Sequence, residues 1–340
     1  MPKCDIIIPV WNQPRITARC LESVTANTLC DYGVIVIDNA SGRETVRVLD
    51  RFKAEVTGRP FSIIRNAENI GFVKAVNEGI HASRAQYICI LNNDTVTAKG
   101  WLTEMLAVAD RNPSIGVLNP SSNNLGQKKP FLMAFKEYAS GVARNSGKYV
   151  EMMSCVGFCM LFRRSLTDEI GMFDEMYGMG NFEDTDFCMR ARERGYLCAR
   201  ALGAYVYHRE NTSFRMIKKH HYDFEKNRVL FESRWGRPRR VFFAVNGAVS
   251  LKEIALRVDE EIKKGNWVFV LSGQGDIAGM LGNRSGLKVY RRGPLFHSLR
   301  ALIKIITKKK KFDIVYTDSK FLTAAAGGLG LSKRAEWRAL

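Results

Sequence analysis

Short apolar segments alternate with helical segments through the first 235 residues, and this alternation limits the fold more than any other feature of the sequence. The apolar segments lie at 5–9, 34–37, 61–64 and 87–91, and each is nearly continuous in apolar residues. Strands of this kind are typical of a parallel sheet that helices cover on both faces. The sequence therefore predicts an α/β fold with a mostly parallel, Rossmann-like sheet between helices.

The predicted strands share a polar or turn-forming residue at their carboxyl ends. Pro9, Asp38, Asn66 and Asp94 occupy these four positions. Turn formation alone would explain any one of them. However, the carboxyl ends of parallel strands meet at one edge of the sheet, where ligands bind in open α/β folds. Four such ends together predict a binding site at that edge.

The segment after the fourth strand, Asn92-Asn93-Asp94, brings three short polar side chains to this edge. One interpretation is a simple turn, because Asn and Asp are common turn residues. The other is a metal site, since carboxylate and amide oxygens bind divalent cations, which in turn can hold a diphosphate. The convergence of strand ends favours the metal site.

Three acidic residues, Glu183, Asp184 and Asp186, open a predicted helix after a glycine-rich segment. Helix capping is the simpler explanation, because carboxylates are stabilised at helix N-termini. Three acids in four residues exceed what a cap requires, and a carboxylate pair beside a flexible segment can act as a general base. His208 ends a further predicted strand at 205–208, and this position favours metal binding over a structural role.

Several common classes of protein and site are disfavoured. No G-x-G-x-x-G follows the first strand and no G-x-x-x-x-G-K-[ST] occurs, which argues against dinucleotide oxidoreductases and P-loop NTPases. The eight cysteines have no C-x-x-C spacing, no secretory signal opens the chain, and no apolar run approaches the roughly 18 residues that span a bilayer. We therefore predict a cytoplasmic protein without structural disulfides.

Two further segments complete the expected first domain. Residues 120–150 are rich in Ser, Asn, Gly and Lys, which predicts a long loop with a hairpin that could act as a lid or as an acceptor-binding insertion. A strand is predicted at 155–162, and Gly157-Phe158 within it marks a point of close approach.

Taken in order, these motifs resemble the inverting family-2 glycosyltransferases with the GT-A fold, especially their rhamnosyltransferase-like branch. The resemblance covers about residues 3–235. It rests on Ile8-Pro9-Val10-Trp11-Asn12, Val36-Ile37-Asp38-Asn39-Ala40-Ser41, Asn69-Ile70-Gly71-Phe72 with Ala75 and Asn77, Leu91-Asn92-Asn93-Asp94, Gly157-Phe158, Phe182-Glu183-Asp184-Thr185-Asp186 and Val206-Tyr207-His208.

The resemblance implies a role for each matching residue. In the donor site, Asp38 would contact the base of a UDP- or dTDP-sugar. The other residues expected to bind the donor are Pro9, Asn12, Asn69, Gly71, Asn77, Asn92, Asn93 and Asp94. Asp94 and His208 would bind Mn²⁺ or Mg²⁺.

The resemblance also implies the chemistry of transfer to a glycan or lipid-linked acceptor. Asp184 would be the catalytic base and Glu183 would orient substrate, while Gly157, Phe158 and Asp186 would contact the acceptor. The base removes a proton from the acceptor hydroxyl, which displaces the nucleotide and inverts the anomeric centre. Asn92 departs from the family's Asp-x-Asp motif, because it replaces the first Asp and leaves the site one charge weaker.

Residues 236–340 form a second predicted domain, after a first domain at 1–235. They contain 21 Lys and Arg against 8 Asp and Glu, a net charge of +13 out of +18 for the chain. Predicted strands at 241–245, 267–271, 287–290 and 312–316 indicate a small α/β unit that weakly resembles part of a GT-B glycosyltransferase domain. A helix at 295–307 followed by four lysines suits either peripheral contact with a membrane or a sheet-covering helix with a solvated end.

Three hypotheses follow. The first is a metal-dependent glycosyltransferase of cell-surface polysaccharide synthesis, and the second is a non-catalytic protein that binds a sugar nucleotide or glycan on the same fold. The retained Asp94, Glu183, Asp184 and His208 favour the enzyme. The third, a nucleic-acid-binding protein, is suggested only by charge and has no recognisable motif, so we expect no nucleic-acid partner.

Overall fold

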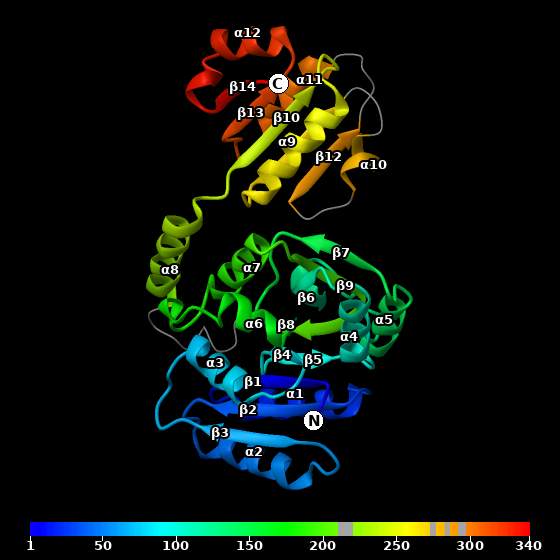
Figure 1. Cartoon of the computed structure of the whole chain (residues 1–340), viewed down its shortest axis with the longest axis vertical. Helices are drawn as coiled ribbons and strands as arrows, with labels where there is room; N and C mark the ends of the chain where they lie inside the picture. Colours follow the sequence, from blue (N-terminus) through cyan, green and yellow to red (C-terminus); the bar gives the residue numbers. More distant parts are fainter. Residues whose placement is uncertain (210–219, 273–276, 283–285, 292–296) are drawn as a thin grey trace. The chain divides into compact units, whose positions relative to one another are not determined.

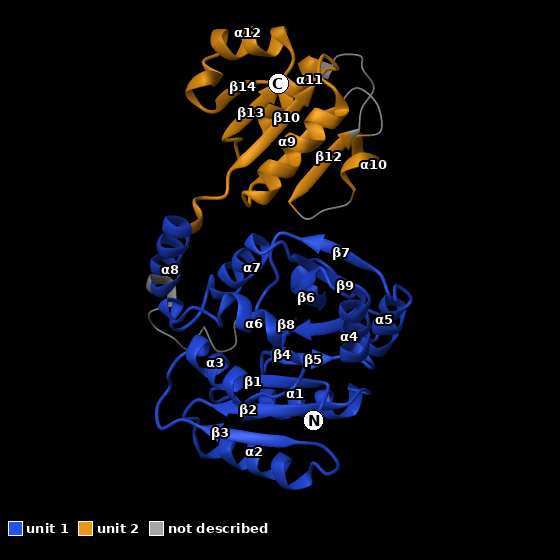
Figure 2. Cartoon of the chain, in the orientation of Figure 1, with its two compact units in different colours: residues 1–234 blue, residues 235–340 orange. Residues whose placement is uncertain are grey.

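The structure is a computed structural model of the 340-residue chain, and it describes residues 1–209, 220–272, 277–282, 286–291 and 297–340 (Figure 1). The chain divides into two compact units, 1–234 and 235–340 (Figure 2). This division lies one residue from the boundary expected from the sequence. Within the described ranges, none of the helices has the length and apolar character that a membrane span requires.

Unit 1 is built on a nine-stranded mixed sheet with the order β3-β2-β1-β4-β8-β6-β9-β5, and β7 pairs with β9. The strands β1 to β4 are mutually parallel, β8 runs against β4 and β6, and β6 is parallel to β9. The mostly parallel sheet expected from the sequence is confirmed. The strands are β1 (Cys4–Val10), β2 (Tyr32–Asp38), β3 (Phe61–Arg65), β4 (Tyr87–Leu91), β5 (Thr95–Thr97), β6 (Ile115–Ser121), β7 (Tyr149–Met152), β8 (Cys159–Arg163) and β9 (Leu197–His208).

Helices cover both faces of this sheet. Apolar residues of α1, α2 and α4 pack in one core with Ile6, Ile8 and Val10 of β1. On the opposite face α3 approaches so closely that a Cβ on Gly79 would lie 2.3 Å from Ile7 Cγ2. The helices of unit 1 are α1 (Pro14–Asn27), α2 (Arg43–Glu55), α3 (Phe72–Ala82), α4 (Trp101–Arg111), α5 (Phe135–Ala143), α6 (Arg164–Ile170), α7 (Glu183–Glu193) and α8 (His220–Trp235, whose last residue belongs to unit 2).

The 120–150 segment contains more structure than the loop predicted from its composition. A 3₁₀ turn at Asn123–Leu125 is followed by α5, and β7 pairs antiparallel with β9. Phe135 and Tyr138 of α5 pack against Tyr205 of β9, with ring centroids 5.8 and 5.1 Å away. These aromatic contacts, made with a residue far along the chain, stabilise a helix that local composition does not indicate.

Unit 2 is a five-stranded sheet, all parallel, with the order β12-β11-β10-β13-β14. One core packs on each face of it. The strand order 3-2-1-4-5 is that of a doubly wound α/β unit. Its elements are β10 (Arg240–Val245), α9 (Leu251–Lys263), β11 (Trp267–Ser272), α10 (Ile277–Leu281), β12 (Leu287–Arg291), α11 (His297–Thr307), β13 (Ile314–Thr317), α12 (Lys320–Gly328) and β14 (Glu336–Ala339).

Candidate active site

Asp94 and His208 meet at the carboxyl edge of the unit 1 sheet. Asp94 follows the end of β4 and precedes β5, and β5 pairs antiparallel with β9 so that Thr95 lies opposite His208. This register places His208 Nε2 3.1 Å from Asp94 Oδ1. The two residues expected to bind metal, 114 positions apart in the sequence, are therefore neighbours.

The imidazole of His208 is fixed on several sides. Asn124 Nδ2 lies 3.0 Å from His208 Nδ1, and Asn123 exchanges two hydrogen bonds of 2.8 Å with the His208 backbone. The ring of Phe158 stacks on the imidazole at 5.0 Å and 14°. Because Nδ1 is engaged by Asn124, the Nε2 atom is the one presented to Asp94.

The donor set at this corner suits a hard divalent cation. In the described part of the chain, Asn92 Oδ1 and Asn124 Oδ1 are buried without a hydrogen-bond partner. Buried amide oxygens normally accept a hydrogen bond or bind an ion. The Asn92 amide oxygen, the Asp94 carboxylate and the His208 imidazole would supply oxygen ligands and one nitrogen, a combination that fits Mn²⁺ or Mg²⁺.

The acid pair begins α7. Glu183 is buried, and its Oε2 has no hydrogen-bond partner among the described residues. Burial, and then the neighbouring Asp184 carboxylate, raise the pKa of Glu183 well above its usual value. Asp184 is only half-buried, and burial raises its pKa as well, although hydrogen bonds from Gly157 and Thr185 oppose that rise. Asp184 is therefore the member of the pair that is both accessible and hydrogen-bonded as a carboxylate.

The Gly157-Phe158 turn connects the acid pair with the Asp94–His208 corner. Gly157 N–H donates to Asp184 Oδ2 at 2.8 Å, and Asn92 N–H donates to the Phe158 carbonyl at 2.8 Å. The Phe158 side chain is buried against His208. One turn thus holds the base candidate through its glycine and the metal candidates through its phenylalanine.

A cluster of polar contacts forms where β1 and β2 end. Asp38 Oδ1 accepts a hydrogen bond from Ser41 N–H at 3.0 Å, and its Oδ2 lies 3.4 Å from Arg65 Nε. Asn12 Oδ1 accepts from Gly42 N–H at 2.8 Å, and Asn12 N–H donates to Ser41 Oγ at 2.8 Å. Pro9 lies beside Ile37 on the paired strands. The structure therefore brings Pro9, Asn12 and Asp38 together, as expected.

Asn39 organises the next part of this edge, and the sequence analysis gave it no role. Its Nδ2 donates to Asn69 Oδ1 at 3.0 Å and to the Gly71 carbonyl at 3.2 Å. Its Oδ1 accepts from Asn66 Nδ2 at 3.2 Å and from Ile70 N–H at 3.3 Å. Two signals were available in the sequence: its place directly after Asp38 at a strand end, and its position within the 36–41 motif that carries the family resemblance.

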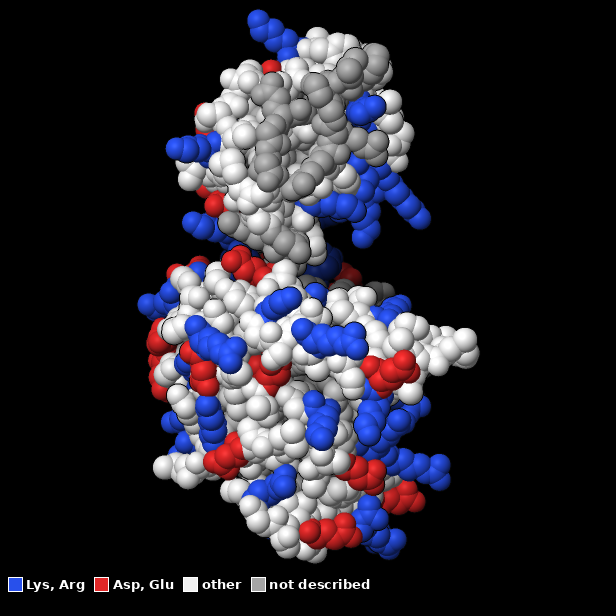
Figure 3. All heavy atoms as spheres, turned by 90° about the vertical axis from the view of Figure 1, so that its right-hand side faces the viewer, with Lys and Arg blue, Asp and Glu red and all other residues white. Residues whose placement is uncertain are grey.

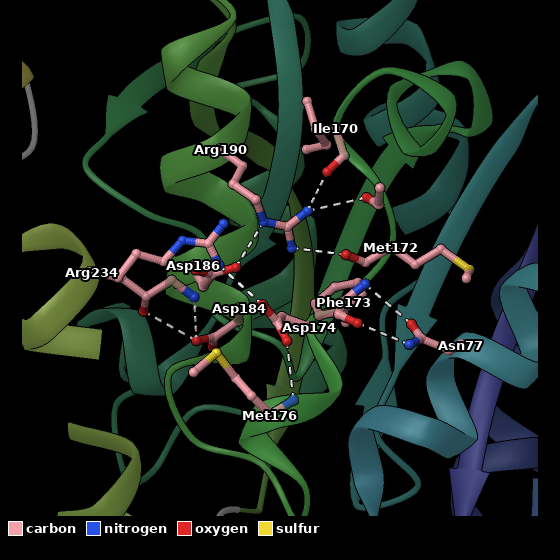
Figure 4. A network of polar contacts seen from close by, with 12 residues as sticks. Asn77, Ile170, Met172, Phe173, Asp174, Met176, Asp184, Asp186, Arg190 and Arg234 are labelled. Carbon is pink, nitrogen blue, oxygen red and sulfur yellow. Dashed lines mark hydrogen bonds and ion pairs between the residues drawn. The ribbon is translucent and has the colours of Figure 1, made fainter. Parts of the chain in front are cut away.

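Three residues expected in the site have different surroundings in the structure. Asn77 is buried, and its amide bonds to both the carbonyl and the N–H of Phe173. Asn93 is buried and donates to Thr17 Oγ1 on α1 at 2.9 Å. Asp186 is fully buried, with Arg190 at 2.8 Å and Arg234 at 3.2 Å (Figure 4). These side chains hold elements together, because each faces a packing partner rather than the open edge.

Helix α8 contributes residues that the sequence analysis did not identify. Asn227 is buried, and its Nδ2 donates to the carbonyls of Tyr177 and Gly180 at 2.8 Å and of Asn181 at 3.3 Å. The segment it holds has left-handed backbone angles at Asn181 and Phe182, with φ of 75° and 74°. Such angles are unfavourable for residues other than glycine. Asn227 therefore stabilises the turn that presents Glu183 and Asp184.

A small cavity of about 230 Å³ adjoins Asp94, and three arginines line it. Arg15 and Arg19 come from the first two turns of α1, and Arg209 follows β9. Arg209 N–H also donates to the Asp94 carbonyl at 3.0 Å. Positive charge of this kind suits a diphosphate. Nothing in the spacing of these arginines along the sequence indicated that they would meet.

Comparison with known proteins shows the family. Residues 5–171 match the sequence profile of glycosyl transferase family 2. The uncharacterized glycosyltransferase YwdF of Bacillus subtilis is 30% identical over 196 residues, which cover 56% of this chain and 68% of that protein. The chain belongs to glycosyltransferase family 2.

Two other relatives are much longer than the matched region. An N-acetylglucosaminyltransferase of Bradyrhizobium diazoefficiens is 27% identical over 176 residues, which cover 48% of this chain and 35% of that protein. The uncharacterized protein y4gI of Sinorhizobium fredii is 25% identical over 254 residues, and this chain spans 26% of its length. The chain therefore corresponds to about a quarter to a third of these two proteins.

Solved structures show the same fold. The mannosyltransferase PcManGT of Pyrobaculum calidifontis, in complex with GDP-Man and Mn²⁺, aligns with a TM-score of 0.51 at 17% identity, over 67% of this chain and 64% of that chain. S. aureus TarS 1-349, in complex with UDP-GlcNAc, aligns with a TM-score of 0.52 at 16% identity, over 77% and 72%. This family-2 glycosyltransferase therefore has the GT-A fold.

Proposed function

We propose that this family-2 glycosyltransferase is an inverting, divalent-metal-dependent enzyme. It moves a sugar from a nucleotide-diphosphate donor to a hydroxyl of a glycan or lipid-linked acceptor, in the synthesis of a cell-surface polysaccharide. The observation that carries the proposal is the Gly157-Phe158 turn, which ties Asp184 to the Asp94–His208 corner. A single displacement at a sugar carbon requires a base for the acceptor hydroxyl and positive charge for the departing diphosphate. One turn would hold both of these at the same site.

The nucleotide binds, in this proposal, along the carboxyl edge of the parallel strands. Asp38, with Pro9 and Asn12 beside it, contacts the base, and Asn69 and Gly71 line the next part of the donor site. The arginine-lined cavity supports this arrangement, because it brings three positive charges next to Asp94. A UDP- or dTDP-sugar is the expected donor, in line with the rhamnosyltransferase-like sequence motifs.

Asp94 and His208 would hold Mn²⁺ or Mg²⁺, with Asn92 as a further oxygen ligand. When bound, the cation supplies positive charge that stabilises the departing nucleoside diphosphate. Mn²⁺ is present in the related structures of the mannosyltransferase PcManGT and of GalNAc-T7. Asn92 in place of a carboxylate leaves the corner with fewer negative charges for the cation.

Asp184 acts as the general base in the proposed reaction. The acceptor hydroxyl loses its proton to Asp184 Oδ as its oxygen bonds to the sugar carbon. The bond from that carbon to the diphosphate oxygen breaks with its electron pair remaining on the diphosphate, so the anomeric configuration inverts. The half-buried position of Asp184 and its hydrogen bond from Gly157 support this role. Glu183, beside it, orients the substrate.

The 120–150 segment is proposed to contact the acceptor. Phe131 and Leu132 are 96% and 94% exposed at its tip. Lys129 Nζ donates to the carbonyls of Pro130, Phe131 and Met133, which holds the tip in shape. The same segment contacts His208 through Asn123 and Asn124. An ordered apolar tip in the segment that supports the metal corner suits an acceptor with an apolar portion.

A cytoplasmic location accompanies this proposal, with unit 1 as the catalytic domain and unit 2 as a small basic accessory domain. All eight cysteines are free, and seven of them are buried. Buried free thiols fit a reducing compartment.

The first experiment is donor binding by thermal shift, using UDP-, dTDP- and GDP-sugars with and without Mn²⁺. Metal-dependent stabilisation by one nucleotide class supports the donor and metal sites. Turnover is then measured as release of the nucleoside diphosphate in the presence of candidate acceptors, with Asp184→Asn as the control. Donor binding without turnover of any acceptor would favour a binding protein, and the absence of any donor binding would overturn the proposal.

A further inference from the structure

We propose that unit 2 docks on an anionic lipid bilayer through the outward face of α11 and the basic groove beside that helix. All the residues involved belong to unit 2, so the inference does not rest on the catalytic assignment of unit 1. It explains two features that the active site leaves unused. One is the positive charge of the C-terminal region, and the other is a row of exposed apolar residues.

The basic groove holds part of the positive charge of unit 2. It has a volume of about 720 Å³ and lies at the amino ends of β10, β11 and β12. Six of its lining residues are basic, and none of those that the structure describes is acidic. The lining residues are Arg240, Trp267, Phe269, Gly286, Leu287, Lys288, Lys304, Thr307, Lys308, Lys309 and Lys310. Figure 3 shows Lys and Arg side chains gathered on unit 2.

Aromatic rings fix several of these cations in the groove. The Arg240 guanidinium lies 4.6 Å from the Phe269 ring centroid, and Lys304 Nζ lies 3.3 Å from that of Tyr290. Lys308 Nζ lies 5.7 Å from the Phe269 ring. Cation–π contacts hold the aliphatic stems against the wall, and the charges are thereby ordered before any ligand arrives. An ordered array of cations is suited to several phosphates at once.

Helix α11, which lines the groove through Lys304 and Thr307, is apolar on two faces. Ala301, Leu302 and Ile305 are buried against the sheet. Leu299, Ile303 and Ile306 are 45%, 50% and 41% exposed. Their spacing of four and three residues places them on one face. A helix that only covers a sheet has no use for a second apolar face.

Together, the apolar row and the cations match an anionic membrane surface. Leu299, Ile303 and Ile306 can enter the interfacial region, while the lysines reach the phosphates. Trp267, 47% exposed in the groove, is a residue type that favours the membrane–water interface. A nucleic acid would account for the lysines but would leave the apolar row exposed to water. The combination of positive charge and exposed apolar side chains therefore favours an anionic membrane over a nucleic acid as the partner of this surface.

The test is flotation of the full chain with vesicles, either of phosphatidylcholine alone or with about one third phosphatidylglycerol. The wild type is expected to float only with the anionic vesicles, and less as salt rises. The charge variant Lys308→Gln/Lys309→Gln/Lys310→Gln is expected to weaken partitioning roughly a hundredfold, since each lysine near such a surface contributes a factor of about five. The apolar variant Ile303→Ser/Ile306→Ser is expected to weaken it at least tenfold.

Matched controls separate these effects from loss of folding or of net charge. Lys252, Lys263 and Lys333 are exposed lysines of unit 2 outside the groove, and changing all three to Gln removes the same charge. Leu256→Ser removes an apolar residue of α9 that is 66% exposed. Both controls should float like the wild type, and all variants should keep the wild-type melting temperature and response to donor nucleotide.

Several results would overturn the proposal. The first is that the wild type does not float with anionic vesicles. The second is that the Lys308/Lys309/Lys310 variant floats as well as the Lys252/Lys263/Lys333 control. The third is that the Ile303/Ile306 variant floats as well as Leu256→Ser. Capture of a single-stranded oligonucleotide in preference to the vesicles would instead identify the groove as a nucleic-acid site. Loss of donor binding in unit 1 variants would leave the flotation result unchanged, so the two proposals fail independently.

Discussion

The backbone N–H of Gly157 donates a hydrogen bond to Asp184 Oδ2 at 2.8 Å. This bond stabilises the carboxylate form of Asp184 beside a buried glutamate that opposes it. An ideal Cβ at Gly157 would lie 3.5 Å from both Asp184 Oδ2 and Glu183 Oε1. The glycine therefore faces both acids.

Asp184→Asn should lower kcat by about 10²- to 10⁴-fold while leaving donor affinity unchanged, because it removes the proton acceptor and keeps the shape. The measurement is nucleoside diphosphate release under saturating donor and acceptor. Asp168→Asn, an exposed residue of α6, is the matched control and should behave like the wild type. Wild-type turnover by Asp184→Asn would remove Asp184 from the role of base.

Asn92→Asp should tighten Mn²⁺ binding and lower the stability of the metal-free protein. The new carboxylate adds charge to the corner where Asp94 and His208 meet, and Asn92 Oδ1 is buried without a partner among the described residues. Without metal, two neighbouring buried carboxylates repel each other. A Mn²⁺ titration of the melting temperature, with and without donor, measures both effects. Asp94→Asn should weaken Mn²⁺ binding. If both variants change the Mn²⁺ affinity in the same direction, Asn92 and Asp94 do not bind the same cation.

Glu183→Gln should stabilise the folded protein at neutral pH and lose this advantage in acid. The pKa of Glu183 is raised in the folded state, so the folded protein retains a proton that the unfolded chain releases above about pH 4.3. Wild-type stability therefore falls as pH rises from that value through the folded pKa. Melting temperatures of both proteins across pH give the difference. Glu22→Gln on the exposed side of α1 is the control, and an equal gain at all pH values would contradict the argument.

Gly71→Ala should destabilise the protein and lower activity more than Gly58→Ala does. Both glycines have positive φ, of 90° and 76°, so each substitution strains the backbone, and Gly71, with ψ of 167°, lies in a region that essentially only glycine adopts. Only at Gly71 would the new Cβ also lie 2.9 Å from a backbone atom, the Gly178 carbonyl oxygen, whereas Gly58 has open space. Urea unfolding and turnover of both variants separate strain from contact. Equal effects would show that the approach of Gly71 to the 177–181 turn is unimportant.

Phe131→Ala/Leu132→Ala should raise the KM for an acceptor with an apolar portion, with the KM for donor unchanged. Each side chain is almost fully exposed, so its removal costs little folding stability. Steady-state kinetics give the KM for a lipid-linked acceptor and for a short water-soluble glycan. Only the KM for the lipid-linked acceptor should rise, because only that acceptor has an apolar portion. Leu29→Ala, an exposed residue after α1, is the apolar control. A rise in KM for donor alone would place the tip in the nucleotide site.

Much of unit 1 could be predicted from local patterns. The strand at Tyr87–Leu91 and its polar end follow from an apolar run that stops at turn residues. The position of His208 at a strand end was likewise visible, and the register of β5 against β9 then brought it to Asp94. Composition failed at 135–143, where α5 forms because Phe135 and Tyr138 pack on Tyr205.

The sequence by itself determined the fold class, the family and the kinds of residue at the site, because apolar periodicity and turn chemistry act over a few neighbouring positions. Tertiary structure alone decided where individual polar side chains point. Asn93 donates a hydrogen bond to Thr17 on α1, whereas its neighbour Asp94 faces His208. Asn227 reaches the Tyr177 carbonyl from 50 positions away. A side chain bonds to whatever the packed elements bring near it, and that neighbour is set by the whole fold rather than by the adjacent sequence.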